Sequence, residues 1–309
     1  MVNHIKNKKN MNILKSSKLV ITTILLLICC SSLFGQKLAP KERKMEPDHT
    51  ITSNITGKEY LLEISFPKSY STKDSISYPV LYVADGRDLT VPSLRAAQKF
   101  MMDSKEYEQV IIVGISSAID RSSWKIDRAQ DYTPSIDTLK QKEIEKYLKL
   151  PEGSLVIGEA AKFLECIKTE IIPFIDKSYK TNNDRGIAGH SLGGLFTTYC
   201  LVNSDGYFTR FGISSPTLTW DNEKLLNQAV TQFNENKTWD LPQTKVFISV
   251  GGKDYPNYLY CFVKFYTTLE RCDYKNINLQ YQIFEKETHM SIIPASMSRI
   301  LSVLYGKNE

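Results

Sequence analysis

The stretch DRGIAGHSLGGLF, residues 184–196, decides the fold prediction. Within it Gly189-His190-Ser191-Leu192-Gly193 matches the pattern Gly-x-Ser-x-Gly. A serine in this pattern lies on a tight turn from a strand into a helix, where only glycine fits two positions before and after it. The apolar residues before the motif and LFTTYCLV after it supply the strand and the helix. We therefore predict an exposed nucleophilic serine at position 191; the alternative is a glycine-rich turn without chemistry.

A serine hydroxyl needs a neighbouring base to act as a nucleophile. The chain has four histidines: His4, His49, His190 and His289. The first two lie far before the motif, and we expect His190 to point away from the serine. His289 follows the last predicted strand, in the chain order that such a base takes after the serine. Elimination therefore selects His289 as the general base.

The third member of a catalytic triad is expected at the end of a strand between the serine and the histidine. Asp254 ends the segment VFISVGGKD, residues 246–254, directly after two glycines. Asp221 and Glu287 are competing carboxylates, and Asp254 itself has an alternative role at the start of the helix that Pro256 opens. We predict the triad Ser191, Asp254 and His289.

Acyl transfer also needs hydrogen-bond donors for the oxyanion. The amide of Leu192 lies at a helix N-terminus beside the serine, and the loop Asp85-Gly86-Arg87 follows a buried strand. We predict Leu192 and Gly86 as the oxyanion hole, because glycine lets the backbone approach a substrate closely; a plain turn glycine is the alternative. This chemistry needs no cofactor, and the sequence predicts no metal site.

After about residue 40, the chain alternates apolar strand-like segments with longer amphipathic ones, which predicts an α/β fold. We expect a mostly parallel central sheet, an N-terminal antiparallel hairpin through residues 54–57, and helices on both faces. One domain spanning residues 40–307 is the simplest organisation. The polar stretch 116–155 is the expected cap or substrate loop. Predicted strands are 50–53, 59–66, 79–84, 110–115, 186–189, 210–214, 245–250 and 279–284; predicted helices are 91–103, 135–148, 159–178, 192–202, 222–234, 256–271 and 292–305.

The net charge of +5 belongs to the N-terminal segment. Residues 1–35 contain five lysines and no acidic residue, which leaves 34 basic and 34 acidic residues in the rest of the chain. The apolar run LVITTILLLI, residues 19–28, follows these lysines and precedes small and polar residues. Residues 1–35 therefore predict a signal peptide and a periplasmic or secreted protein, with lipidation at Cys29 or Cys30 as the lesser alternative. The neutral charge of the chain after residue 35 argues against a nucleic-acid partner. No other stretch there approaches membrane-spanning length, so without lipidation we expect no membrane partner.

In six segments after the N-terminal region, the chain resembles the esterase D-like α/β hydrolases, which include enterochelin-type siderophore esterases, S-formylglutathione hydrolases and carbohydrate esterases. The resemblance extends from about residue 54 to residue 305, and siderophore esterases are the most similar group. The segments that carry it are YPVLYVADG (78–86), DRAQDYTP (127–134), FLECIKTEIIPFIDKSY (163–179), DRGIAGHSLGGLF (184–196), SSPTLTW (214–220) and ETHMSIIPASM (287–297).

The resemblance implies hydrolysis of a small-molecule carboxylic ester through an acyl-Ser191 intermediate. It also implies an arginine that contacts the ligand, for which Arg128 and Arg87 are candidates, a salt bridge being the alternative for each. Trp220 is a candidate cleft wall, or else a core residue. The rival functions are a carbohydrate esterase, an acyltransferase and a non-catalytic ligand-binding protein. The sequence makes no prediction about the oligomeric state.

Overall fold

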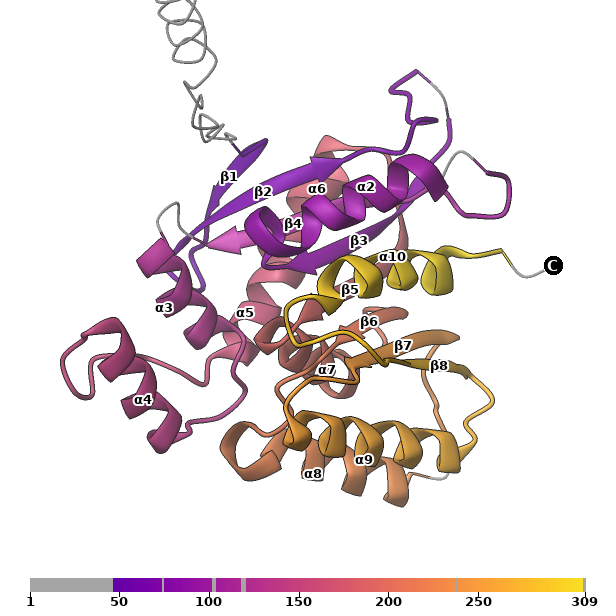
Figure 1. Cartoon of the computed structure of the whole chain (residues 1–309). Helices are drawn as coiled ribbons and strands as arrows, with labels where there is room; N and C mark the ends of the chain where they lie inside the picture. Colours follow the sequence, from indigo (N-terminus) through magenta and orange to yellow (C-terminus); the bar gives the residue numbers. More distant parts are fainter. Residues whose placement is uncertain (1–46, 74, 102–103, 118–120, 237, 308–309) are drawn as a thin grey trace, which may run out of the picture. The chain divides into compact units, whose positions relative to one another are not determined.

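The computed structural model describes residues 47–309 except 74, 102–103, 118–120, 237 and 308–309 (Figure 1). Pro47–Glu309 forms one compact unit. The predicted signal peptide, with Cys29 and Cys30, lies outside the described residues. In the part that is described, no helix is both long and apolar enough to cross a membrane.

Eight strands form a single sheet in the order β1-β2-β4-β3-β5-β6-β7-β8. From β4 across to β8 all neighbouring strands are parallel, whereas β2 pairs antiparallel with both β1 and β4. The mostly parallel α/β sheet with an antiparallel edge is thereby confirmed. The strands are β1 (His49–Thr52), β2 (Glu59–Ser65), β3 (Tyr78–Ala84), β4 (Ile111–Ser117), β5 (Thr181–His190), β6 (Arg210–Ser214), β7 (Thr244–Gly251) and β8 (Ile277–Phe284).

The predicted hairpin joins β1 to β2. The turn closes with hydrogen bonds from the amide of Gly57 to the carbonyl of Ser53 and from the amide of Ser53 to the carbonyl of Lys58, at 3.0 and 2.8 Å. Gly57 has a φ of 70°, a conformation that glycine adopts without strain. The hairpin extends the sheet beyond β4, and β3 and β5 lie at the centre of the strand order.

Helices cover both faces of the sheet, as predicted. Figure 1 shows α2 and α10 side by side on one face, while α7 packs on β5 and β6 from the other. The helical segments are η1 (Gly86–Thr90), α2 (Val91–Met101), α3 (Arg121–Asp131), α4 (Thr138–Leu148), α5 (Ala160–Cys166), η2 (Ile167–Ile171), α6 (Ile172–Ser178), α7 (Leu192–Asn203), α8 (Trp220–Glu235), α9 (Pro256–Cys272) and α10 (Ile292–Tyr305).

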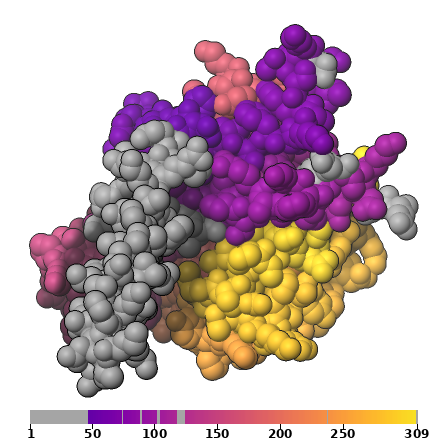
Figure 2. All heavy atoms as spheres, turned by 45° about the horizontal axis from the view of Figure 1, so that its top comes forward, coloured from indigo at the N-terminus to yellow at the C-terminus, as the bar shows by residue number. Residues whose placement is uncertain are grey.

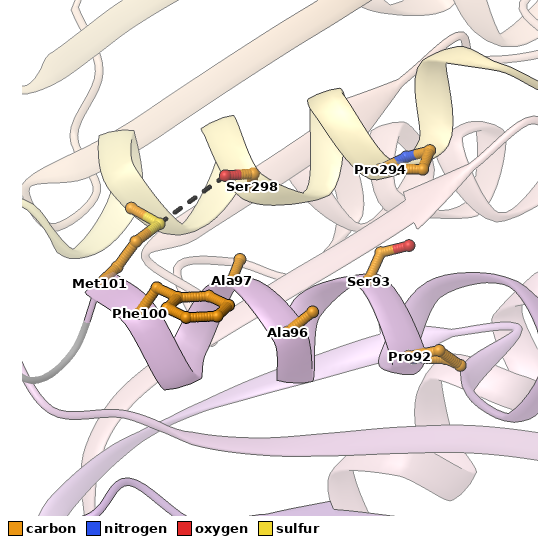
Figure 3. A pocket seen from close by; sticks show the side chains of 8 residues that line it. All are labelled: Pro92, Ser93, Ala96, Ala97, Phe100, Met101, Pro294 and Ser298. Atoms are coloured by element: carbon orange, nitrogen blue, oxygen red, sulfur yellow. Dashed lines mark hydrogen bonds between the residues drawn. The ribbon is translucent and has the colours of Figure 1, made fainter.

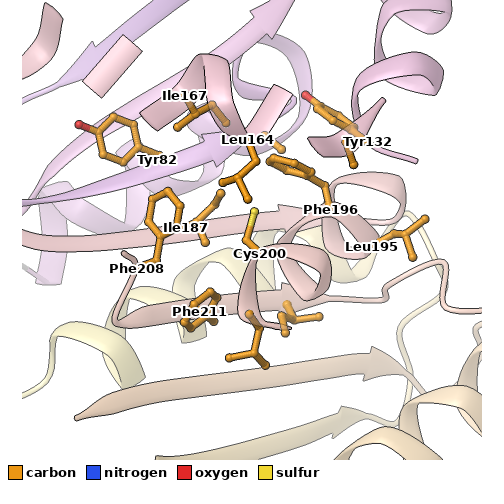
Figure 4. Packing of buried hydrophobic residues seen from close by; sticks show 14 of the residues in the cluster. Tyr82, Tyr132, Leu164, Ile167, Ile187, Leu195, Phe196, Cys200, Phe208 and Phe211 are labelled. Carbon is orange, nitrogen blue, oxygen red and sulfur yellow. The ribbon is translucent and has the colours of Figure 1, made fainter. Parts of the chain in front are cut away.

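The larger core fills the α7 face of the sheet. Phe196 and Cys200 of α7 pack among Ile187 of β5, Phe211 of β6 and Leu164 of α5, and all five are buried (Figure 4). Burial of each large apolar side chain stabilises the fold by about 1.5–3 kcal/mol. This packing fixes the start of α7, and with it residue 191, relative to the sheet.

The smaller core lies on the opposite face. Leu81 and Val83 of β3 belong to this smaller core, whereas Val80 and Tyr82 belong to the larger one. Successive residues of β3 thus alternate between the two cores, as expected for a strand that is buried on both faces. The surfaces of α2 (purple) and α10 (yellow) meet in Figure 2. A shallow, mostly apolar groove of about 510 Å³ runs between these two helices, from Pro92 and Pro294 towards Met101 (Figure 3).

The structure differs from the sequence prediction in three segments. The region 116–155 is more ordered than predicted, because β4 continues to Ser117 and α3 follows it; Figure 1 shows α4 projecting beyond the sheet. The helix predicted over 159–178 contains a π-helical turn, η2. At the start of α8, Asp221, Asn222 and Glu223 have φ of 50–61°, so a left-handed turn precedes the regular helix.

Candidate active site

The nucleophile turn has the geometry that its glycines predict. Ser191 lies between β5 and α7 with φ 60° and ψ −118°, a strained conformation for a residue with a side chain. A Cβ atom at Gly189 would overlap the backbone of Gly193, and one at Gly193 would lie 3.1 Å from the Cβ of Ala84. The Ser191 amide donates to the carbonyl of Ser214 at 3.0 Å, which ties the turn to the end of β6.

Ser191, His289 and Asp254 form a hydrogen-bonded row. Nε2 of His289 lies 3.0 Å from the Ser191 Oγ, and its Nδ1 lies 3.1 Å from each carboxylate oxygen of Asp254. With the proton on Nδ1, the imidazole donates to Asp254 and leaves Nε2 to accept from the serine hydroxyl. The structure thus brings together the three residues of the predicted triad in the arrangement that nucleophilic acyl transfer requires.

Two glycines hold the aspartate loop against the histidine loop. A Cβ at Gly251 would lie 2.5 Å from the carbonyl oxygen of Glu287, and one at Gly252 would lie 2.6 Å from that of Glu285. The amide of Lys253 donates to the carbonyl of Glu287 at 2.9 Å. The two backbones therefore approach more closely than any side chain would allow, which brings Asp254 within reach of His289.

The competing carboxylates lie elsewhere. Asp221 is in the left-handed turn before α8 and faces Lys224 at 3.5 Å. Glu287 accepts a hydrogen bond from the Ser291 hydroxyl at 2.5 Å. Of the three candidate carboxylates, Asp254 is therefore the one that contacts the His289 imidazole.

Ionisation favours a charged Asp254 and a neutral His190. Burial alone would raise the pKa of Asp254, but hydrogen bonds from His289, Ser215 and the Tyr255 amide, together with the charge of His289, outweigh it, and the pKa falls below the usual value. His190 is buried, and its ring packs on that of the predicted base His289, with 4.7 Å between the ring centroids. Burial, aided by the nearby His289 and Arg128, lowers the pKa of His190 to about 3.

A second hydrogen-bonded row reaches the serine through Thr217 and Tyr258. The Thr217 hydroxyl lies 3.3 Å from the Ser191 Oγ and accepts a hydrogen bond from the Tyr258 hydroxyl at 3.2 Å. The Tyr258 ring also stands edge-on to His289, with 5.2 Å between ring centroids. Sequence reasoning missed both residues: Thr217 lies within SSPTLTW and Tyr258 within a predicted helix, and neither position carries a distinguishing motif.

The predicted oxyanion donors lie on two adjoining turns. Leu192 is the first residue of α7, so its amide is among those that have no carbonyl partner within the helix. Gly86 opens η1, and a Cβ there would lie 2.5 Å from the Cα of Gly114 on β4. Close packing on β4 thus explains the glycine, which is a different reason from the substrate approach that the sequence suggested.

The three predicted substrate-binding residues are in unequal positions. Arg128 forms a salt bridge with buried Asp85, the alternative role that its sequence left open. Arg87 is half-buried next to Gly86, and its amide donates to the Ser116 hydroxyl at 2.9 Å. Trp220 is only 4% exposed and its indole donates to the carbonyl of Ser135 at 2.9 Å, so it is a core residue and not a cleft wall.

The rim of the site carries exposed apolar side chains. Tyr255, next to Asp254, is 59% exposed with its ring centroid 5.6 Å from that of His289, and Met290 is 56% exposed.

Among the residues that the structure describes, no group of three or more His, Cys, Asp or Glu side chains is placed to hold a metal ion.

Comparison with known proteins identifies the family. The esterase family model matches residues 53–290. The siderophore enterobactin esterase of Emericella nidulans is 25% identical over 184 residues, covering 57% of this chain and 60% of that protein. The apo-salmochelin esterase of Escherichia coli is 25% identical over 243 residues, covering 77% and 73%. The crystal structure of a BES protein from Bacillus cereus superposes with a TM-score of 0.70 at 26% identity, covering 84% of this chain and 95% of that one.

The matched segment includes the sheet from β2 to β8, the Ser191 turn and the loop that carries His289. The order of strands and the positions of the three residues at the ends of β5, β7 and β8 agree with an α/β hydrolase. The chain therefore belongs to the esterase family of carboxylic ester hydrolases.

Proposed function

We propose that this protein is an exported serine esterase that cleaves its substrate through an acyl-Ser191 intermediate. The row of Ser191, His289 and Asp254, with hydrogen-bond distances of 3.0 and 3.1 Å, is the observation that carries the proposal. His289 takes the proton from the serine hydroxyl as the oxygen attacks the ester carbonyl, and returns it to the leaving alcohol. A water molecule then repeats these steps on the acyl group.

Asp254 and the two turns have separate roles in this scheme. The charged carboxylate keeps the imidazole in the tautomer that accepts from serine and stabilises the imidazolium that forms. The amides of Leu192 and Gly86 donate to the carbonyl oxygen as it becomes negative. Removing one such donor in an acyl-transfer enzyme costs about 100–1,000-fold in kcat.

For the substrate, we propose a siderophore trilactone or a related ester. The named relatives are siderophore esterases, and the exposed Tyr255 and Met290 beside His289 suit a ligand with apolar or aromatic parts. The neutral charge balance after residue 35 gives no general attraction for an anionic ligand. Comparing the hydrolysis of a ferric catecholate trilactone with that of feruloylated or acetylated sugars and simple acyl esters tests this substrate proposal. The trilactone should have the highest kcat/KM.

Replacement of the nucleophile tests the proposal. Ser191→Ala is expected to abolish hydrolysis of p-nitrophenyl esters and labelling by a fluorophosphonate, because no other hydroxyl lies within hydrogen-bond distance of His289 Nε2 in the described residues. Ser302→Ala, near the C-terminal end of α10, is the matched control and should retain both activities. Equal turnover by Ser191→Ala would refute a serine mechanism, and transfer to an added alcohol in preference to water would identify an acyltransferase.

Export rests on the sequence of residues 1–35 and has its own test. Expression of the full chain in a bacterium with an outer membrane should yield a shortened protein in the periplasm or the medium. Mass spectrometry of its N-terminus distinguishes cleavage near residue 35 from a lipidated cysteine. Full-length protein that remains in the cytoplasm would contradict export and would leave the esterase proposal standing.

A further inference from the structure

The loop that carries Gly86 lies directly against the nucleophile turn. A Cβ at Gly193 would lie 3.1 Å from the Cβ of Ala84 and 3.4 Å from a carboxylate oxygen of Asp85. The Asp85 carboxylate is thus close to the first turn of α7, where the Leu192 amide is offered. Any negative charge left unpaired on Asp85 would oppose the charge that develops on a substrate oxyanion in the same place.

Asp85 is held in a conformation that needs support. Its φ of 54° and ψ of 42° are in the left-handed region, which residues with a side chain disfavour. Its amide donates to the Tyr132 hydroxyl at 3.0 Å, and the Thr90 hydroxyl contacts the carbonyls of Ala84 and Asp85 at 3.0 and 3.1 Å. Both backbone groups of Asp85 are therefore fixed by side chains.

Arg128 of α3 completes this support. Its Nε donates to one carboxylate oxygen of Asp85 at 2.9 Å and its Nη2 donates to the other at 2.7 Å. The Asp85 side chain is 0% exposed and that of Arg128 is 15% exposed. The guanidinium also lies over the rings of Trp124 and Tyr132, at 5.0 and 5.6 Å from their centroids. A two-point bond of this kind fixes orientation as well as charge.

We infer that Arg128 is a positioning residue that acts through Asp85: it holds the Gly86 loop in place and neutralises the carboxylate beside the oxyanion hole. It does not serve as a ligand for the substrate, because the fork of donors that would grip an anionic ligand is already bound to Asp85. The inference rests on the proposed function, since it assigns a role towards the oxyanion of that reaction.

Four variants test it: Arg128→Met, Arg128→Lys, Asp85→Asn and the double variant Arg128→Met/Asp85→Asn. Arg128→Met should lower kcat about 10–100-fold with little change in KM, a part of the loss expected for removing a donor outright. Arg128→Lys keeps the charge without the fork and should fall between this variant and the wild type. The double variant should recover to the activity of Asp85→Asn, because no unpaired carboxylate remains.

Binding of an arylboronic acid separates positioning from substrate contact. The boronate forms a tetrahedral adduct with a catalytic serine, and one of its oxygens occupies the oxyanion hole. Its affinity should fall in Arg128→Met by about the factor lost in kcat/KM, as transition-state binding requires. A raised KM with unchanged kcat and unchanged boronate affinity, or a double variant no better than Arg128→Met, would overturn the inference and favour a substrate-binding arginine.

Hydrogen exchange provides a test that does not depend on catalysis. Amides of the loop and η1 should lose protection in Arg128→Met, whereas those of β8 should not. Tyr132→Phe, which removes only the acceptor of the Asp85 amide, should produce a smaller loss in the same loop and serves if Arg128→Met does not fold. Unchanged protection in both variants would refute the positioning role. If the wild type lacks a reactive serine, the proposed function fails, and this measurement still decides whether Arg128 holds the loop.

Discussion

Two buried carboxylates flank the serine, and each has a basic partner: Asp254 with His289, and Asp85 with Arg128. The two aspartate side chains are 0% exposed and the partners are 16% and 15% exposed, so the pairs are matched in burial. They differ in geometry. Arg128 uses two nitrogens at 2.9 and 2.7 Å, whereas the single Nδ1 of His289 lies 3.1 Å from both oxygens.

The difference separates a reactive pair from a fixed one. An imidazole gains and loses a proton near neutral pH and can turn about its one contact with the carboxylate, whereas a guanidinium stays charged and its fork prevents rotation. We therefore expect the Asp254 pair to take part in each proton transfer, and the Asp85 pair to stay unchanged through the cycle. The same burial of an aspartate thus supports two different tasks beside one nucleophile.

The largest expected effect breaks the reactive pair. Asp254→Asn should lower kcat roughly 1,000–10,000-fold, because an amide no longer enforces the histidine tautomer that accepts from serine. Steady-state kinetics with a p-nitrophenyl ester measures this loss. Asp221→Asn and Glu287→Gln remove the two competing carboxylates and should retain wild-type kcat; a loss in either that equals the loss in Asp254→Asn would move the acid to that residue.

An intermediate effect is expected from the second hydrogen-bonded row, in which Tyr258 donates to Thr217 and Thr217 contacts Ser191. Thr217→Val keeps the shape of the side chain and removes one hydrogen bond to Ser191, worth about 1 kcal/mol or roughly fivefold in kcat. Tyr258→Phe removes a hydrogen bond one step further from the serine and should lower kcat less. The rate of fluorophosphonate labelling, measured for both variants, should follow the same order. A larger effect of Tyr258→Phe than of Thr217→Val would show that its ring contact with His289 matters more than this row.

The smallest effect concerns a third buried carboxylate, Asp131, which lies outside the site and pairs with Lys58 at 2.6 Å. Burial raises its pKa to about 6 in spite of that lysine. The native state therefore binds more protons than the unfolded chain from about pH 4 to pH 6, and the free energy of unfolding falls as the pH rises through this window.

Asp131→Asn removes this dependence. Relative to the wild type, its free energy of unfolding should increase between pH 4 and pH 7, as measured by urea denaturation at each pH. Asp254→Asn should show the opposite trend, and only below about pH 4, because the pKa of Asp254 is lowered in the fold and its contribution to stability is lost as the pH falls below the usual value. A parallel response of the two variants would contradict the assigned burial effects.

The sequence predicted what depends on local pattern. All eight strands occur near their predicted positions because apolar runs between turns are readable in sequence, and the glycine spacing around Ser191 reflects a steric requirement of the turn itself. The row of Ser191, His289 and Asp254 followed from chain order. What the sequence did not show depends on tertiary contact: α3, RSSWKIDRAQD, has few apolar residues, and its Arg128 is held by an aspartate 43 residues away.

The same reason explains the uncertain substrate residues. An arginine in a polar segment and a tryptophan after a strand have the same local signal whether they meet a ligand or another part of the chain. Only the structure shows Trp220 in the core and Arg128 against Asp85. The ring contact between His190 and His289 likewise depends on how a strand end meets a loop that is about 100 residues away in the chain.

The position of α3 matters for attempts to alter specificity. The segment between β4 and α5 looks like an interchangeable cap, since α4 projects beyond the sheet. Yet α3 provides the guanidinium that binds Asp85, and Tyr132 directly after it holds the amide of the same residue. A graft that replaces the whole segment would therefore remove two supports of the loop next to the nucleophile. Recombination between relatives should cross over after Tyr132, so that α4 alone is exchanged and the catalytic geometry is inherited intact.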